Sequence, residues 1–295
     1  MGYLFLGLAN ICGAVKGYCG KMVSSSIKKS SDAMLANFLR MLLCSFIGLA
    51  LVLITGGGSG FNIGASGVWI SLLSGVSNSV FVISWLFAVN FGAYMLVSVF
   101  LTVGLLVPIA LCAIFFGERI EWNHLVGFAV LIAAVLVMCS YSSSVKSKLG
   151  KKAIVLLFIC GTSSGLASFS QKWFVYTTNG GSIPAFNFYT YVFASIVLLT
   201  SYLIFRDKKK SENSEKFTLR PVWHYVTIMA VMLFSNSYLM TLAASKLDAV
   251  LLYPLSTGIG LVLSALMCSI FFKEKLSLRG WISVTLACVG TCFFV

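Results

Sequence analysis

Four polar side chains stand inside long apolar stretches, where a polar group is costly. Lys16 and Arg40 carry positive charges, and Asn78 and Asn236 carry amides. A cation at the centre of a membrane-spanning helix costs about 2.5–3.5 kcal/mol, unless its long side chain reaches the nearby interface. Two cations at similar depth in neighbouring helices could attract a carboxylate or a phosphate, whereas a buried amide bonds either a neighbouring helix or a ligand. These four residues are therefore the candidate ligand-binding residues.

Acidic side chains are few, and the pattern places all eight at helix ends or in loops. A proton-coupled exporter of organic cations usually relies on a carboxylate buried in the membrane, so the pattern disfavours that activity. We expect Glu118 and Glu274 to be structural, pairing with loop cations or capping helix ends. Gln171 and Lys172, near the end of an apolar stretch, are expected to anchor the chain at the membrane interface.

No motif for a cofactor, a metal or a catalytic nucleophile stands out. The nine cysteines form no C-x-x-C pair and have no histidine at metal-ligand spacing. No nucleotide-binding loop occurs, and the one G-x-S-x-G match, at 161–165, lies in an apolar stretch rather than at a strand-to-helix turn. We expect no cofactor, no metal and no enzymatic activity.

The elements that would hold the four polar residues are membrane helices. The chain is 59% hydrophobic and 10% charged, with a mean hydropathy of +0.98, whereas a soluble domain carries about 25% charged residues. About 20 apolar residues cross a bilayer. The sequence therefore predicts an all-α integral membrane protein with ten spans at roughly 3–25, 34–55, 67–89, 92–116, 121–141, 152–175, 185–205, 222–244, 248–272 and 279–295.

The net charge of +13 comes mostly from short connections, which indicates membrane topology rather than nucleic-acid binding. Fifteen basic residues follow odd-numbered spans and two follow even-numbered ones. Because cytoplasmic loops carry the excess of Lys and Arg, this bias predicts that both termini lie outside the cytoplasm.

The two halves of the chain share ordered motifs, which predicts a repeat with halves at 1–145 and 146–295. The matching pairs are Gly13-x-x-x-Gly17 with Gly161-x-x-x-Gly165, Asn37-Phe38 with Asn187-Phe188, Val68-Trp69 with Val222-Trp223, Ser77-Asn78-Ser79 with Ser235-Asn236-Ser237, and Phe115 to Ile120 with Phe271 to Leu276. Since each half has an odd number of spans, the second half enters from the opposite side. Inverted repeats of this kind place a ligand site near the midplane.

Glycines and prolines would shape the predicted helices. Gly13, Gly17, Gly161 and Gly165 permit close helix packing or a sliding hinge. Pro108 and Pro254 each remove a helix hydrogen bond and could kink their helices.

The ten-span, five-plus-five plan resembles the EamA-like branch of the drug/metabolite transporter superfamily. The marks of the resemblance are Arg40, Pro108 and the span ends Gly117-Glu118-Arg119-Ile120 and Lys273-Glu274-Lys275-Leu276. The resemblance implies a membrane transporter. It also implies termini inside the cell and a basic loop after the second span, but here that loop, 55–67, carries no charge.

The expected function is secondary transport, inward or outward, of small neutral or anionic metabolites such as amino acids by alternating access. A translocase of lipid-linked substrates or a membrane enzyme stays open as the alternative, since Lys16 and Arg40 could hold a lipid phosphate. The expected partners are a small-molecule substrate and the bilayer, with no nucleic acid. The chain is expected to be multi-pass in the plasma or inner membrane, as a monomer or homodimer.

Orientation can be tested with a reporter fused to the C-terminus. The charge bias predicts a signal only from a reporter that is active outside the cytoplasm. A cytoplasmic signal would contradict the charge bias in favour of the family's usual arrangement.

Overall fold

Apolar runs fold here as α-helices, which satisfy their own backbone hydrogen bonds and so tolerate a bilayer. A computed structural model describes residues 1–25, 30–90, 100–140, 151–178, 181–205, 223–271 and 278–294. The α-helices in these ranges are α1 (Gly2–Ser25), α2 (Ser30–Gly56), α3 (Gly64–Asn90), α5 (Leu106–Phe116), α6 (Trp122–Ser140), α7 (Lys151–Thr178), α8 (Ile183–Phe205), α9 (Trp223–Ala244), α10 (Ala249–Phe271) and α11 (Leu278–Cys292). A short 3₁₀ helix, η1 (Gly57–Phe61), follows α2.

The all-α prediction is confirmed for the described residues, which contain no strand. Five described helices are long and apolar enough to cross a membrane, within Asp32–Phe61, Gly64–Ala88, Ile154–Thr178, Ile183–Phe205 and Trp223–Ala244. Four further apolar helices are shorter, at Phe100–Phe116, Trp122–Val137, Ala249–Leu263 and Gly280–Cys292. Ten crossings therefore remain a prediction, and the start of the expected span 92–116 lies outside the described residues.

The outer surface carries large apolar side chains. Ile54, Ile114 and Ile204 are 70–80% exposed. Several large apolar side chains with this exposure are unusual on a surface that faces water. Exposed tryptophans lie near the first turns of four helices, at Trp69, Trp122, Trp223 and Trp281. Tryptophans at helix ends are typical of the membrane–water interface. The chain is therefore a multi-pass integral membrane protein.

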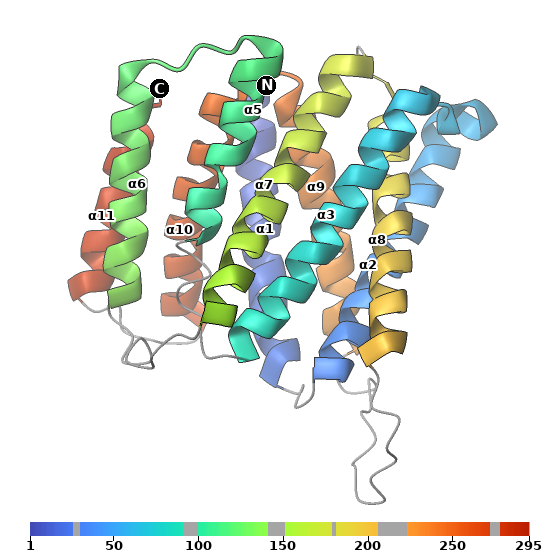
Figure 1. Cartoon of the computed structure of the whole chain (residues 1–295), viewed down its shortest axis with the longest axis horizontal. Coiled ribbons are helices and arrows are strands. Elements are labelled where there is room, and N and C mark those ends of the chain that lie inside the picture. The colour runs from blue at the N-terminus through green and yellow to red at the C-terminus, as the bar shows by residue number, and fades with distance from the viewer. Residues whose placement is uncertain are drawn as a thin grey trace, which may run out of the picture.

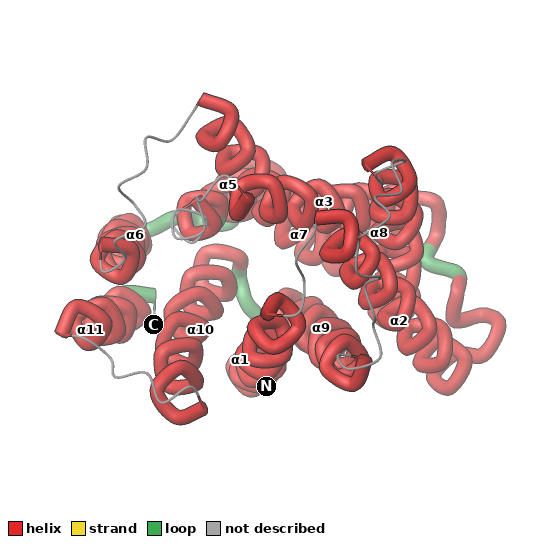
Figure 2. The backbone as a smooth tube through the Cα atoms, turned by 90° about the horizontal axis from the view of Figure 1, so that it is seen from below, coloured by secondary structure: helices red, strands yellow, loops and turns green. Residues whose placement is uncertain are grey.

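The helices form two facing rows with a pair at each end (Figure 2). Helices α10, α1 and α9 make one row, and α5, α7 and α3 make the other. The tightest pairings join helices distant in the sequence: α1 packs along α9, α3 along α7, α2 along α8 and α6 along α11. Both termini lie on the same side of the bundle, which is called the terminal side below (Figure 1).

The two prolines act differently on their helices. The helix that begins before α5 is interrupted by a turn at Leu105, three residues ahead of Pro108. Pro108 has no N–H to donate to Gly104, so the helical ladder is broken at this point. Helix α10 runs through Pro254 without a break.

The two glycine pairs also differ in their surroundings. Gly161 and Gly165 of α7 lie against the backbone at Phe100 and Gly104, so closely that any side chain would meet a carbonyl oxygen. In α1, a side chain at Gly13 would meet only the amide nitrogen of Asn236, at 3.3 Å, and Gly17 faces open space. The Gly-x-x-x-Gly motif therefore permits close backbone contact in α7, whereas in α1 it leaves open space.

This difference predicts opposite effects of alanine. Gly161→Ala pushes a methyl into the Phe100 carbonyl, which should lower the melting temperature through a cost of about 1–3 kcal/mol. Gly17→Ala adds a methyl to open space and gains up to about 1 kcal/mol of helix propensity, so its melting temperature should stay level or rise. Thermal unfolding of the purified variants measures both, and equal destabilisation would contradict the packing described.

Candidate functional site

Polar side chains converge on α9 from the neighbouring helices. Asn236 Nδ2 donates to the carbonyl of Ala9 at 2.6 Å and so ties α9 to α1. On the neighbouring face of α1, Asn10 accepts a 3.2 Å hydrogen bond from Ser256 Oγ of α10. The polar groups of α1 thus point toward both neighbours in its row. Sequence reasoning missed Asn10, although it lies three residues before Gly13.

A second polar chain joins α7, α9 and α8. Gln171 Nε2 donates to Ser237 Oγ at 3.3 Å, and Ser237 donates in turn to Asn187 Oδ1 at 2.7 Å. Asn187 is fully buried and donates its own amide to Ile183. The expectation that Gln171 anchors the interface was wrong, because its side chain turns into the bundle. Spacing alone could not have paired it with Ser237.

Asn78 lies at the position of α3 that matches Asn236 in the predicted repeat, but its amide donates within its own helix. The acceptor is the Ser74 carbonyl, one turn earlier, at 2.9 Å. The neighbouring Ser79 makes the interhelical contact instead, donating to the Ala194 carbonyl of α8 at 3.1 Å. The structure therefore does not bring Asn78 to Asn236.

Lys16 of α1 and Arg40 of α2 are both partly buried and lie within electrostatic range of each other. Cys44 and Tyr191 lie near Arg40. The Nε atom of Arg40 is buried and has no hydrogen-bond partner. Within the described part of the chain, no carboxylate pairs with either cation, so no carboxylate there compensates the two positive charges.

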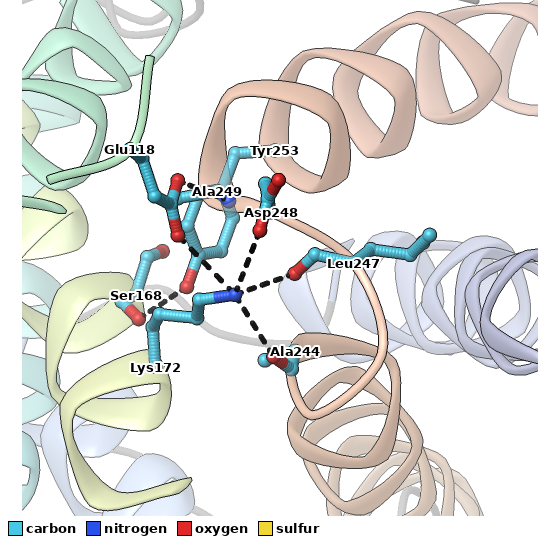
Figure 3. Close-up of polar contacts among 8 residues, drawn as sticks. All are labelled: Glu118, Ser168, Lys172, Ala244, Leu247, Asp248, Ala249 and Tyr253. Atoms are coloured by element: carbon cyan, nitrogen blue, oxygen red, sulfur yellow. Dashed lines mark hydrogen bonds and ion pairs between the residues drawn. The ribbon is translucent and has the colours of Figure 1, made fainter. Parts of the chain in front are cut away.

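Lys172 of α7 is in the opposite situation (Figure 3). Its ammonium pairs with Glu118 Oε1 at 3.2 Å and with Asp248 Oδ1 at 3.8 Å. It also donates to the carbonyls of Leu247, at 2.7 Å, and Ala244, at 3.2 Å. This set is called the Lys172 cluster below. Lys172 is buried, so its predicted interface-anchoring role was wrong.

Glu118 performs two tasks in this cluster. Its side chain is 8% exposed, although Glu118 stands just after the end of α5, where the sequence placed it. One oxygen faces Lys172, and Oε2 accepts the Ala249 N–H at the start of α10, at 2.8 Å (Figure 3). The expected capping role is seen, but the paired cation comes from a helix rather than a loop. Glu274 lies outside the described residues.

The cluster connects the ends of several helices on the terminal side. Glu118 follows α5, Lys172 belongs to α7, and Asp248 stands in the turn between α9 and α10. Tyr253 of α10 adds a 2.5 Å hydrogen bond to the Ser168 carbonyl of α7 (Figure 3). These contacts hold the two facing rows together at this end.

A pocket of about 560 Å³ opens beside the cluster on the terminal side. Glu118 and Asp248 line it together with Arg119, His124 and aromatic side chains that include Phe116 and Phe294. Such a volume suits a small metabolite. His124 itself caps the next helix, since its Nδ1 accepts the Glu121 N–H at 3.1 Å.

The fold and its polar interior define a multi-pass membrane protein with facing helix rows held together at one end. Residues 151–295 match the model of the EamA-like transporter family, and this match supports membership of the drug/metabolite transporter superfamily. It is thus a membrane transporter of that type, in a family whose members are generally not enzymes.

Solved structures agree on the fold. One of them, described as "Crystal structure of protein", is 15% identical and superposes with a TM-score of 0.78 over 99% of this chain and 95% of that chain. At this identity the likeness shows the fold alone. No curated protein matches the chain.

The Lys172 cluster predicts strong coupling between two substitutions. Lys172→Gln or Glu118→Gln alone leaves a buried charge without its partner, and each should cost about 3–5 kcal/mol of stability. The double variant removes both charges and should cost clearly less than the sum. Thermal unfolding of the four proteins measures the coupling, with the exposed Lys246→Gln as control. Additive losses would show that the two charges act independently.

Proposed function

We propose that this transporter is a secondary carrier of small neutral or anionic metabolites, such as amino acids, in the cell membrane. It has ten spans in two inverted five-helix halves, 1–145 and 146–295, and works by alternating access. The cargo lies between the halves, within reach of Lys16, Arg40, Asn78 and Asn236. The family match supports transport, and the pattern of helix contacts supports the mechanism.

The observation that carries the proposal is the reciprocity of the helix contacts. In the proposed repeat, α1, α2, α3, α5 and α6 of the first half correspond in order to α7, α8, α9, α10 and α11 of the second. Exchanging the halves turns the α1–α9 contact into α7–α3, and α1–α10 into α7–α5. It turns α2–α9 into α8–α3 and returns α2–α8 and α6–α11 to themselves. All of these contacts occur.

Equivalent residues add to this support. Asn37 and Asn187 open the second helix of their halves, and each donates its amide to the carbonyl four residues earlier, Ala33 and Ile183. The family match also begins at residue 151, close to the proposed boundary. Two halves with the same internal contacts can rock between two mirror-related packings, which is the basis of alternating access.

We infer from the Lys172 cluster which side of the bundle is closed in this conformation. It joins Glu118 of the first half to Lys172 and Asp248 of the second, on the terminal side. Separating the halves on that side would break this buried pair. In the proposed cycle, the conformation described here is therefore the one closed on the terminal side. To open that side, the cargo must bind the open conformation more tightly than the closed one.

The test is a thermal-shift screen of metabolites followed by flux into liposomes. A metabolite that stabilises the protein should be carried across in a saturable way and down its gradient. Lys16→Gln and Arg40→Gln should lower the flux by at least about tenfold, which corresponds to about 1.4 kcal/mol. Lys246→Gln removes an exposed charge and should transport like the parent protein.

The amide residues need a readout that separates cargo binding from helix packing. If Asn236 binds cargo, Asn236→Ala lowers the flux of the correctly folded fraction; if it serves only the Ala9 bond, it lowers the melting temperature alone. Asn78→Ala, whose amide bonds only its own helix, should change stability little. Failure of every stabilising ligand to cross in either direction would overturn the proposed transport.

A further inference from the structure

Among the described side chains, Lys16, Arg40 and Lys172 are cations within the bundle, and their surroundings differ sharply. Lys172 has two carboxylates and two backbone carbonyls within bonding distance. Lys16 and Arg40 have no carboxylate partner among the described residues, and Lys16 lies within electrostatic range of Arg40. The protein thus compensates one internal cation fully and leaves two adjacent ones uncompensated.

The local side chains cannot supply the missing negative charge. Cys44 Sγ donates to the Ala230 carbonyl at 3.3 Å, and Tyr191 Oη donates to the Leu233 carbonyl at 3.4 Å. Both are neutral groups whose protons are already committed. The buried Nε of Arg40 remains without an acceptor. A buried donor without an acceptor is costly, and two like charges at short range repel strongly in a medium of low dielectric.

We propose that Lys16 and Arg40 form an anion subsite that binds one oxyanionic group, a carboxylate or a phosphate, between α1 and α2. The subsite rests on the proposed function and narrows its cargo from neutral or anionic compounds to those that carry such a group. Ammonium and guanidinium groups are donors only, so their ligand must be an acceptor. A planar guanidinium suits a carboxylate or phosphate edge through two parallel hydrogen bonds.

Space for the rest of the ligand lies along α1. Gly17 adjoins Lys16 and faces open space, and Gly13, one turn earlier, stands opposite the Asn236 amide. In the proposed subsite, the rest of a molecule held at Lys16 would extend past these glycines toward α9. The glycines of this helix thus leave room at the place where the charges are unpaired.

The same geometry makes the bound anion a clamp. Without an anion between them, the two like charges repel each other. An anion between them converts the repulsion into two attractions. Since two positive charges are present, a phosphate with a charge near −2 compensates them more completely than a single carboxylate does.

This predicts a sign difference between lysine substitutions when no anion is present. In dilute sodium chloride, Lys16→Gln relieves repulsion, so its melting temperature should equal or exceed that of the parent. Lys172→Gln leaves the buried Glu118 carboxylate without its cation and should melt lower. Lys246→Gln, an exposed control, should match the parent. A loss for Lys16→Gln as large as that for Lys172→Gln would overturn the subsite.

Titration with anions is the direct test. Sodium phosphate or sodium acetate, exchanged for sodium chloride at constant ionic strength, should raise the melting temperature of the parent and of Lys246→Gln by several degrees. Lys16→Gln and Arg40→Gln should lose that rise. If Arg40→Gln does not fold, Lys16→Gln alone decides the outcome. No response in the parent, or an equal response in every variant, would overturn the proposal.

Lipid headgroups are another source of the same chemistry, and nanodisc composition separates the two. If free cargo supplies the anion, the phosphate response persists in nanodiscs of pure phosphatidylcholine. If a lipid phosphate supplies it, phosphatidylglycerol replaces that response, and the Lys16→Gln difference appears only with this lipid. Either result supports the subsite, and the second argues against a soluble cargo.

Failure of the subsite can be told apart from failure of transport. Anion stabilisation that depends on Lys16, without flux of any anion, would support the subsite and overturn the carrier. Saturable flux of neutral compounds that is unaffected by Lys16→Gln, without an anion response, would support the carrier and overturn the subsite.

Discussion

Lipid offers no hydrogen bonds, so every polar group inside this bundle must find its partner in the protein. The backbone meets this demand by forming helices, and hydroxyl side chains meet it by bonding carbonyls of the preceding turn, as Ser45, Ser71 and Thr241 do. Longer polar side chains reach across to other helices, as Asn236 and Ser237 do. Among the buried side-chain atoms described, Arg40 Nε, Thr190 Oγ1 and Glu118 Oε1 have no hydrogen-bond partner, and only the last faces an opposite charge.

That demand divides the internal cations into two kinds. Lys172 is surrounded by carboxylates and carbonyls, so it contributes a fixed contact between the facing rows. Lys16 and Arg40 have no carboxylate partner among the described residues, and the buried Nε of Arg40 has no acceptor. A structural cation gains by being compensated in place. A cation that must release its partner in each cycle cannot be compensated permanently, because a permanent partner would compete with the cargo.

Sequence reasoning could predict the helices because the apolar runs that lipid requires are local in the chain. It also singled out Lys16 and Arg40, whose charges interrupt such runs. It could not predict the Lys172 cluster, because Glu118, Lys172 and Asp248 come from three places in the chain and only packing brings them together. The glycine pairs show the same limit: one spacing gives close contact at Gly161 and open space at Gly17, since the neighbouring helix decides.

The scaffold and its polar groups follow different symmetries. In the proposed repeat, the contacts of α1 and α2 with α9 correspond to those of α7 and α8 with α3, so these backbone contacts alone would treat the two sides of the membrane alike. The polar side chains break this equivalence: Asn236 bonds another helix where Asn78 bonds its own. Lys16 stands where the matching glycine motif of α7 has Ser164, and Arg40 stands where α8 has Thr190. In the proposed two-half scaffold, directionality must therefore come from these few unmatched side chains. The same side chains would also distinguish one cargo from another.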